Sequence, residues 1–346
     1  MHSQTVFHLS HTDLDGYSCQ LISSEIFKNV RFYNANYGKE ISDTLKILLS
    51  DIWLYGSKKN LILITDLNLT IEQCEFLLKE IEKAQRDIEI LLLDHHKTGQ
   101  DCANKYNWYH LDSNRSATKI TYDYFLDKYP KIGYLEKFVN VVNAIDIWIS
   151  DSEYFELGKV CMKLVADSKE INRVLFAKEN SEYIFYLIKN SWKYFDKEHP
   201  QIALDDNIHF IKKSFFRGDG KDDTIENLIA NFVVKLLNDK KEQMSVTYKG
   251  YKGLLTYSIG NTTIVGNAFL LQNPDYDFFI DINSRKNVSL RGNNKVDVSL
   301  IAKELFAGGG HANASGGRYE AFVNSYSYDN IKTQIQNLMN QGSKDG

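Results

Sequence analysis

Cysteine is scarce in this chain of 346 residues, and the four that occur are scattered. Cys19, Cys74, Cys102 and Cys161 form no CxxC pair, so the sequence predicts neither a disulfide framework nor a cysteine-based zinc site. Long apolar runs are missing as well, because stretches such as 90–93 fall far short of the roughly 20 residues that a membrane span needs. The N-terminal segment lacks the basic and apolar regions of a secretory signal. We therefore expect a cytoplasmic protein with no membrane partner.

An excess of positive charge is also missing. The 41 lysines and arginines stand against 45 aspartates and glutamates, which gives a net charge of −4. A strongly basic surface of the kind that clamps long duplex DNA is thereby excluded, although a local basic patch is not. The composition, 43% hydrophobic and 25% charged, is that of a globular protein, and the length favours two domains.

The first hundred residues alternate apolar runs with amphipathic segments. Strands are expected at 5–9, 30–33, 61–65 and 88–93, and helices at 16–27, 41–49 and 71–84. Continuous apolar strands separated by helices indicate a parallel sheet that is covered on both faces. The predicted fold class is therefore α/β.

The rest of the chain is predicted to add helices and a second α/β module. Residues 117–190 have a helical pattern, and a connecting helix is expected at 225–237. Strands are then expected at 244–248, 253–259, 278–283 and 288–291, and helices at 262–271, 298–305 and 328–339. We predict an N-terminal parallel-sheet domain over 1–195, a linker and connecting helix over 196–242, and a smaller α/β domain over 243–346.

Acidic and imidazole groups directly follow three of the expected strands. These groups are His11, Asp13 and Asp15 after the first strand, Asp66 after the third, and Asp94, His95 and His96 after the fourth. In open α/β sheets ligands bind at this edge, where the carboxyl ends of the strands meet. A single aspartate there often caps the following helix, but a cap does not explain three clusters. Carboxylates this close repel one another unless a cation binds between them, so we predict a metal cluster.

Asp146 is a further candidate ligand, because it lies inside the apolar helical pattern of residues 139–148. The alternative is that Asn143 and Asp146 form an exposed polar face. Carboxylates and imidazoles without a thiolate suit Mn²⁺ or Mg²⁺ better than structural zinc. The segment from His11 resembles the first half of an EF-hand loop, but Ile22 stands where that loop needs a glutamate.

A glycine-rich segment, GGGHANASGG at 308–317, stands out in the C-terminal module. Glycines let the backbone approach a ligand and expose N–H groups to phosphate oxygens. The segment is neither a P-loop nor a dinucleotide fingerprint, and a flexible turn is the alternative. His311 and Ser315 within it, and Arg291 upstream, favour a phosphate cradle over a plain turn. Arg291 suits this role better than Arg318, since a planar bidentate donor matches a terminal phosphate.

Taken together, these segments resemble the DHH–DHHA1 phosphoesterases. Asp94-His95-His96 matches the motif that names the group, and residues 308–317 match the signature loop of the DHHA1 domain. The segment from His11 to Gly16, Asp66 and Asp146 are similar to further motifs, in the family's order, over about residues 5–322. In one respect the chain departs from many small members of the family: His11 stands two residues before Asp13, a spacing more like the RecJ exonuclease branch.

The resemblance implies a role for each of these residues. One Mn²⁺ would be held by His11, Asp13 and Asp66, and a second by Asp15, Asp66, His95 and Asp146. His96 would contact the scissile phosphate, and Asp94 would orient a neighbouring group. The DHHA1 module would hold the far end of the substrate in an interdomain cleft, through Arg291, Gly308, Gly309, Gly310, His311 and Ser315. Arg115 and Ser116 are weaker phosphate-binding candidates, since helix capping explains Ser116 equally well.

The predicted function is a two-metal phosphodiesterase or phosphatase that hydrolyses short phosphorylated nucleotides. Candidate substrates are oligoribonucleotides of a few units, linear dinucleotides and 3′-phosphoadenosine 5′-phosphate, with two Mn²⁺ (or Mg²⁺ or another divalent ion) as cofactors. A RecJ-like single-strand exonuclease is the alternative. Hydrolysis of pyrophosphate or polyphosphate, and a non-catalytic nucleotide-binding protein, are less favoured. The resemblance also leads us to expect a homodimer.

Overall fold

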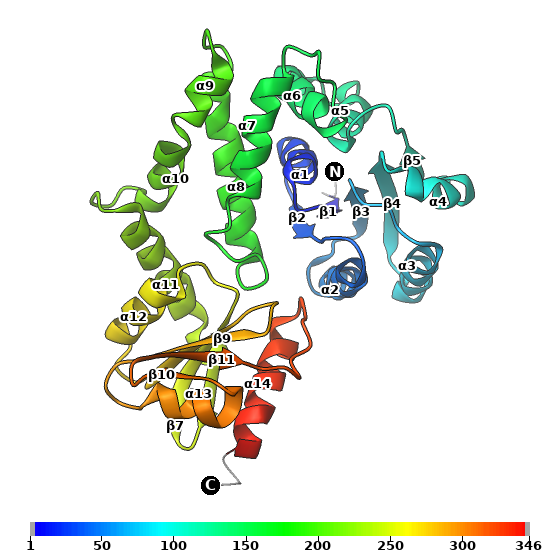
Figure 1. Cartoon of the computed structure of the whole chain (residues 1–346). Coiled ribbons are helices and arrows are strands. Elements are labelled where there is room, and N and C mark those ends of the chain that lie inside the picture. The colour runs from blue at the N-terminus through cyan, green and yellow to red at the C-terminus, as the bar shows by residue number, and fades with distance from the viewer. Residues whose placement is uncertain (1–3, 343–346) are drawn as a thin grey trace. The chain divides into compact units, whose positions relative to one another are not determined.

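The computed structural model describes residues 4–342, which form two compact units (Figure 1). Within the described residues, the first unit comprises 4–168 and 181–211, and the second comprises 169–180 and 212–342. The expected linker is thus divided, with 196–211 in the first unit and 212–242 in the second. The domain bounds given above stay a prediction. Within the described range, no helix is long and apolar enough to cross a membrane.

The sheet of the first unit consists of five parallel strands in the order β2-β1-β3-β4-β5. They are β1 (Thr5–Ser10), β2 (Val30–Asn34), β3 (Lys59–Thr65), β4 (Asp87–Asp94) and β5 (Tyr109–Leu111). The strand order reverses at β1, so that β2 and β3 lie on either side of it. Such a reversal is the place where doubly wound sheets bind ligands, beyond the carboxyl ends of the strands.

Helices cover both faces of this sheet, as Figure 1 shows. They are α1 (Leu14–Ile26), α2 (Lys39–Tyr55), α3 (Ile71–Ala84), α4 (Gln100–Lys105), α5 (Ala117–Leu126) and α6 (Glu136–Asp146), and α7 (Phe155–Ala166) packs on α6. Neighbouring strand residues point to opposite faces. Phe7 and Leu9 therefore pack with α2, α3 and α4, while Val6 packs with α1, α5 and α6. This burial on both faces is why the strands read as unbroken apolar runs.

Helical segments continue the chain beyond α7. They are α8 (Ala177–Ser191), α9 (Pro200–Asp205) and α10 (Ile208–Arg217), with 3-10 turns η1 (Lys97–Gly99), η2 (Pro130–Leu135) and η3 (Trp192–Tyr194) along the first 200 residues. The second unit then begins its main part with α11 (Ile225–Met244), which Thr224 caps by accepting a hydrogen bond from the backbone N–H of Asn227.

The second unit is built on a mixed sheet of six strands in the order β10-β11-β9-β8-β7-β6. They are β6 (Ser245–Tyr248), β7 (Tyr251–Tyr257), β8 (Phe278–Ile282), β9 (Asn287–Gly292), β10 (Gly309–His311) and β11 (Ala314–Arg318). Only β7 and β8 pair in parallel; the other neighbours are antiparallel. Its helices are α12 (Thr262–Gln272), α13 (Val298–Phe306) and α14 (Tyr328–Gly342).

The predicted fold class is confirmed: the chain has a parallel-sheet α/β unit and a second, mixed α/β unit. Every strand and helix expected in the first hundred residues and after residue 225 is present, with ends that differ by up to seven residues. The strand β5, the helix α4 and the hairpin of β10 and β11 were not expected, because they are too brief for hydrophobic periodicity to reveal them. The helices α9 and α10 lie where the sequence predicted a linker.

Candidate metal centre and active site

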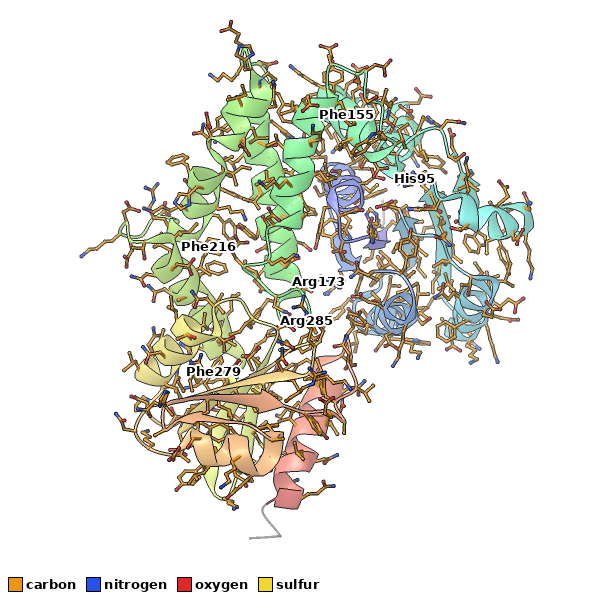
Figure 2. The ribbon with its side chains drawn as sticks, viewed as in Figure 1. His95, Phe155, Arg173, Phe216, Phe279 and Arg285 are labelled. Carbon is orange, nitrogen blue, oxygen red and sulfur yellow. The ribbon has the colours of Figure 1, made fainter. Side chains whose placement is uncertain are left out.

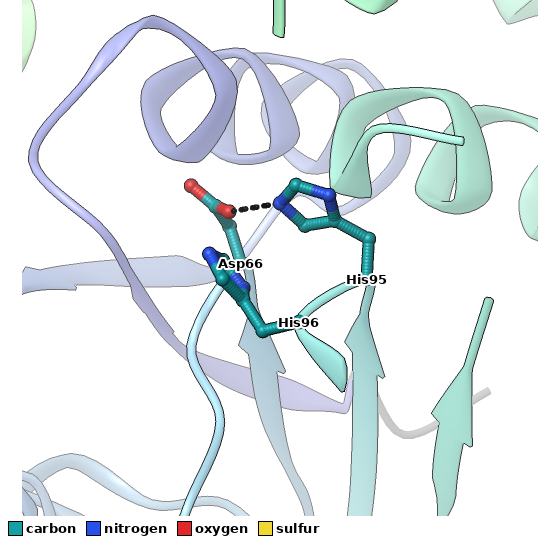
Figure 3. A group of neighbouring side chains, drawn as sticks. All are labelled: Asp66, His95 and His96. Atoms are coloured by element: carbon teal, nitrogen blue, oxygen red, sulfur yellow. Dashed lines mark ion pairs between the residues drawn. The ribbon is translucent and has the colours of Figure 1, made fainter. Parts of the chain in front are cut away.

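Three strand ends bring the predicted acidic and imidazole groups together at one edge of the first sheet. His11 and Asp13 follow β1, Asp66 follows β3, and His95 follows β4. Figure 3 shows Asp66 and His95 facing each other above two neighbouring strands. The atoms Asp66 Oδ1 and His95 Nε2 are 3.3 Å apart. The β1–β3 and β3–β4 pairings therefore place these groups together at the carboxyl ends of the strands, as the sequence pattern predicts.

The first cluster of possible metal ligands consists of His11, Asp13 and Asp66, with ligand atoms within 4.8 Å of one another. His11 Nδ1 lies 2.7 Å from Asp13 Oδ2 and 3.7 Å from Asp66 Oδ2. The other oxygen of Asp13 accepts a hydrogen bond from Gly16 N and so caps α1. Burial raises the pKa of Asp13, but the bonds to His11 and Gly16 outweigh it and lower the pKa to about 2. Asp13 thus serves as a helix cap and still presents one ionised oxygen to the cluster.

The second cluster consists of Asp15, His95 and Asp146. His95 Nε2 lies 3.6 Å from Asp146 Oδ2 and 3.9 Å from Asp15 Oδ2. The Asp15 carboxylate is held in place by α5, because it accepts hydrogen bonds of 2.8 and 2.9 Å from the backbone N–H groups of Ala117 and Thr118. Free N–H groups at a helix N-terminus favour an anion, so α5 stabilises this buried carboxylate.

Asp66 stands between the two clusters. Its Oδ2 faces His11 and its Oδ1 faces His95. The backbone of Asp66 is left-handed, with φ of 55°, a conformation that costs energy for a residue with a Cβ and that is concentrated at functional sites. One carboxylate therefore offers an oxygen to each cluster.

The electrostatics of the metal-free groups are unfavourable. Burial and the nearby charge of Asp13 and Asp15 raise the pKa of Asp66 well above its usual range. Burial and the same two neighbours raise the pKa of Asp146 to about 9, and burial lowers the pKa of His95. Asp66 Oδ2 and Asp146 Oδ2 are buried and have no hydrogen-bond partner among the described residues. Buried carboxylates that lack donors and crowd one another fit a site for divalent cations. These acidic and histidine groups can thus hold a metal.

His96 has a different environment from His95. Its Nδ1 lies 2.7 Å from Asp94 Oδ1, and the hydroxyl of Tyr109 donates a hydrogen bond of 2.7 Å to Asp94 Oδ2. Burial opposes protonation of His96, but the bond to Asp94 raises its pKa overall. The hydroxyl of Tyr37 lies 3.1 Å from both ring nitrogens of His96. The ring of Tyr37 also contacts the ring of His11.

Sequence reasoning missed Tyr37 and Tyr109 as residues of this site. Tyr37 comes from the loop before α2 and Tyr109 from the short strand β5, and neither carries a motif. His8, on β1, is fully buried and contacts the hydroxyls of Ser23 and Thr65. Ser116 caps α5 by accepting a hydrogen bond from Lys119 N, so the capping interpretation describes its contact in the structure.

In the second unit, the glycine-rich segment forms the β10–β11 hairpin beside β9. His311 pairs with Ala314, which in turn pairs with Arg291, and directly paired residues share a face of the sheet. Ser315 lies on the other face, where it is buried and donates a hydrogen bond to the carbonyl of His311. The hairpin thus brings Arg291 and His311 into one row and separates Ser315 from them.

The glycines of this hairpin are required by its geometry at two points. A Cβ on Gly308 would lie 2.0 Å from the carbonyl oxygen of Gly316, and Gly310 has a positive φ of 146°. Gly309 has open space around it, and its side of the hairpin is exposed. Backbone geometry therefore explains two of the three predicted phosphate-contacting glycines, and the backbone N–H of Gly308 donates to the carbonyl of Ala302.

Arg291 is held by two hydrogen bonds from its guanidinium group. Nη1 donates to the carbonyl of Leu290 at 2.7 Å, and Nη2 donates to the hydroxyl of Thr263, in the first turn of α12, at 2.6 Å. Its Nε is buried and has no partner among residues 4–342. The side chain is therefore fixed at the N-terminus of a helix, where an anion is favoured.

Comparison with known proteins defines the class of this chain. No family model matches it. A curated protein from Helicobacter pylori (strain ATCC 700392 / 26695), named 3′,5′-cyclic-nucleotide phosphodiesterase, is 43% identical over 343 residues, which cover 97% of this chain and 99% of the relative. The predicted class, a hydrolase of phosphoric ester bonds, is confirmed. The chain belongs to the family of this H. pylori phosphodiesterase.

One solved structure shares the fold of this chain. The crystal structure of an uncharacterized protein from Helicobacter pylori G27 has a TM-score of 0.92 and 43% identity, and the match covers 98% of this chain and 99% of that one. An exopolyphosphatase-related protein from Bacteroides fragilis matches over 99% of this chain, with 13% identity and a TM-score of 0.26. That last likeness is too weak to inform fold or function.

Proposed function

We propose that this chain is a two-metal phosphodiesterase or phosphatase of the DHH–DHHA1 type that hydrolyses phosphate esters of small nucleotides. The observation that carries the proposal is the position of Asp66, which directs one carboxylate oxygen to each of two clusters of acidic and imidazole groups. The name of the H. pylori relative supports nucleotides as the substrate class.

The proposed ligand sets follow these clusters. His11, Asp13 and Asp66 would hold one ion, and Asp15, Asp66, His95 and Asp146 the other. Mn²⁺ is our first candidate and Mg²⁺ the second, because oxygen and imidazole donors suit both. When bound, the ions would neutralise phosphate charge and lower the pKa of a water ligand.

The side chains around the clusters would position the phosphate. We propose that His96 contacts a phosphate oxygen, since its raised pKa favours the cationic form that stabilises negative charge there. Asp94 holds the His96 ring from behind. In the second unit, we propose that Arg291, His311 and the backbone of Gly308, Gly309 and Gly310 bind another part of the substrate. Ser315 would support the hairpin through its bond to His311.

Four kinds of nucleotide are candidate substrates. Three of them contain a 3′–5′ phosphodiester bond, and the last carries a 3′-phosphate monoester. They are 3′,5′-cyclic mononucleotides, linear dinucleotides, oligoribonucleotides of a few units and 3′-phosphoadenosine 5′-phosphate. The position of His11 favours one alternative, because its RecJ-like spacing from Asp13 brings it within 2.7 Å of that carboxylate. A RecJ-like single-strand exonuclease is therefore the second candidate. A homodimer and a cytoplasmic location stay predictions.

The test is a turnover assay with Mn²⁺ or Mg²⁺. The substrates are 3′,5′-cAMP, 2′,3′-cAMP, 3′-phosphoadenosine 5′-phosphate and 5′-phosphorylated RNA of two to about twenty nucleotides. The variants are Asp66→Asn and His95→Ala, and His209→Ala, an exposed histidine of α10, is the matched control. Calorimetric titration with Mn²⁺ adds a readout that does not depend on turnover.

The outcomes separate the candidates. Turnover of 3′,5′-cAMP or of the shortest RNAs, lost in Asp66→Asn and His95→Ala but kept in His209→Ala, supports the proposal. Rates that hold or rise with RNA length move the chain to the exonuclease alternative. Metal binding in the wild type without turnover of any of these nucleotides overturns the proposed substrate class, and unchanged Mn²⁺ binding in Asp66→Asn overturns the proposed bridging role.

A further inference from the structure

An indole ring follows the candidate metal ligand Asp146 directly. Asp146 is the last residue of α6, with its Oδ2 3.6 Å from His95 Nε2. Trp148 stands two residues later and exposes 65% of its surface. Because consecutive Cα atoms are about 3.8 Å apart, the Cα atoms of Asp146 and Trp148 are separated by at most about 7.6 Å. Trp148 is thus within a side chain's reach of the second cluster.

The backbone at Trp148 has a conformation that favours glycine. Trp148 N donates to the carbonyl of Ile145 and Ile149 N to the carbonyl of Ala144, the pair of bonds that ends a helix in a Schellman motif. In this motif the first residue after the helix cap has a left-handed backbone. That residue is Trp148, which has φ of 58°. Glycine usually occupies this position in helices that end in this way, because a Cβ there costs stability. A tryptophan is therefore kept where the fold alone favours a residue without a side chain.

Packing does not account for this residue. The indole of Trp148 meets the ring of Phe155 edge to face, with centroids 5.0 Å apart and planes at 84°. Phe155, the first residue of α7, is buried, and Figure 2 labels it in the same unit as His95. This contact holds the indole at one side, but about two-thirds of the residue stays in contact with solvent. Burial of so little surface gives a small hydrophobic gain.

We propose that Trp148 is the platform on which the nucleobase of the substrate stacks while its phosphate lies at the metal clusters. Residues held in a strained backbone conformation cluster at active sites and ligand clamps. A nucleobase offers a flat π-face, and in a nucleotide it lies one sugar away from the phosphate, which matches an indole so close to Asp146. Stacking of this kind tolerates any base, so the site would accept purines and pyrimidines. This inference rests on the proposed function, since it needs a nucleotide at the clusters.

The test compares two phosphates that differ only in the base. AMP and ribose 5-phosphate are titrated calorimetrically into the full chain loaded with Mn²⁺, for the wild type and for Trp148→Ala, Trp148→Phe and Trp148→Gly. Trp53→Ala is the matched control, because Trp53 is also exposed, at 55%, but lies on α2. We expect Trp148→Ala to weaken AMP binding about 5- to 100-fold and ribose 5-phosphate binding less than twofold. Trp148→Phe should restore part of the difference.

The glycine variant separates a binding role from a structural one. Trp148→Gly relieves the left-handed backbone, so its urea midpoint should equal or exceed that of the wild type while its AMP affinity falls as in Trp148→Ala. A lower midpoint with unchanged AMP affinity would show that the indole supports the fold and would overturn the inference. An equal loss of affinity for AMP and for ribose 5-phosphate in Trp148→Ala would also overturn the inference. A wild type that binds the two ligands equally well would overturn it too.

These results are distinguishable from a failure of the proposed function. A wild type that hydrolyses 3′,5′-cAMP while Trp148→Ala binds AMP normally refutes the platform alone. A chain that hydrolyses no nucleotide refutes the proposed function, whatever the AMP titrations show.

Discussion

The hydroxyl of Tyr109 donates a 2.7 Å hydrogen bond to the Asp94 carboxylate, which lies on the neighbouring strand. Both residues are buried, and the other oxygen of Asp94 is 2.7 Å from His96 Nδ1. The carboxylate that orients His96 is therefore itself oriented by β5, at the edge of the sheet. Second partners of this kind fix the orientation of a ring, here the one that we propose contacts the substrate.

Removal of the Tyr109 hydroxyl should lower turnover without removing the metal. We expect Tyr109→Phe to reduce kcat about tenfold, within the 10- to 100-fold range typical of such supporting groups, and Asp94→Asn to cost more. Tyr122→Phe is a matched control, because Tyr122 is a buried tyrosine whose hydroxyl donates to the carbonyl of Gly133. Steady-state kinetics on the best nucleotide substrate measure this, with Mn²⁺ affinity as the second readout. Equal kcat in wild type and Tyr109→Phe would show that His96 does not need this support.

Gly158 should be intolerant of a side chain because α7 packs closely on α6. A Cβ at Gly158 would lie 2.7 Å from Ile145 Cβ and 2.9 Å from the carbonyl oxygen of Val141. We expect Gly158→Ala to lower the free energy of unfolding by about 1–3 kcal/mol. Turnover should fall as well, because Ile145 directly precedes Asp146. Gly133→Ala, where a Cβ meets nothing within 4 Å, is the control. Urea denaturation of the two variants decides the matter, and equal midpoints would contradict this packing.

Arg291 should contribute to substrate binding more than to the chemical step. Its guanidinium is fixed by Thr263 and Leu290 at the start of α12, and we expect Arg291→Ala to raise KM about 10- to 100-fold, as the loss of a charged hydrogen bond would. Arg291→Lys should recover little, because an ammonium group lacks the planar pair of donors. Arg318, which pairs with Glu320 at the surface, provides the control variant Arg318→Ala. A change confined to kcat would assign Arg291 a different role.

The sequence allowed the gathering of the acidic and imidazole groups at one sheet edge to be predicted, because it depends on strand order and strand ends. Once the apolar runs before Asp66 and Asp94 are taken as neighbouring parallel strands, their last residues must meet at one edge. Tyr109 could not be predicted this way, since β5 is only three residues long and its register is set by packing. Ser315 shows the opposite case: a motif residue whose face of the sheet follows only from the pairing of β11 with β9.

Asp281 should make the stability of the second unit depend on pH. This carboxyl lies in β8, only 5% exposed, where Oδ1 accepts hydrogen bonds from the hydroxyl of Thr256 and from Ile259 N. Burial raises its pKa to about 7, against an ordinary 3.8. Between these two values the folded chain binds more protons at this site than the unfolded chain. The contribution of Asp281 to the free energy of unfolding is therefore largest below about pH 4 and is lost as the pH rises toward 7.

The variant that isolates this effect is Asp281→Asn, which stays neutral at every pH and keeps an oxygen acceptor for Thr256 and Ile259. Urea unfolding is measured at pH 4.5, 5.5, 6.5 and 7.5 for the wild type and the variant. The free energy of unfolding of the wild type, minus that of Asp281→Asn, should fall as the pH rises. The total fall expected between pH values below 3.8 and above 7 is of the order of 4 kcal/mol. Asp219→Asn, at an exposed position, should leave the wild-type slope unchanged. Parallel slopes for wild type and Asp281→Asn would mean that Asp281 ionises as readily in the folded chain as in the unfolded one.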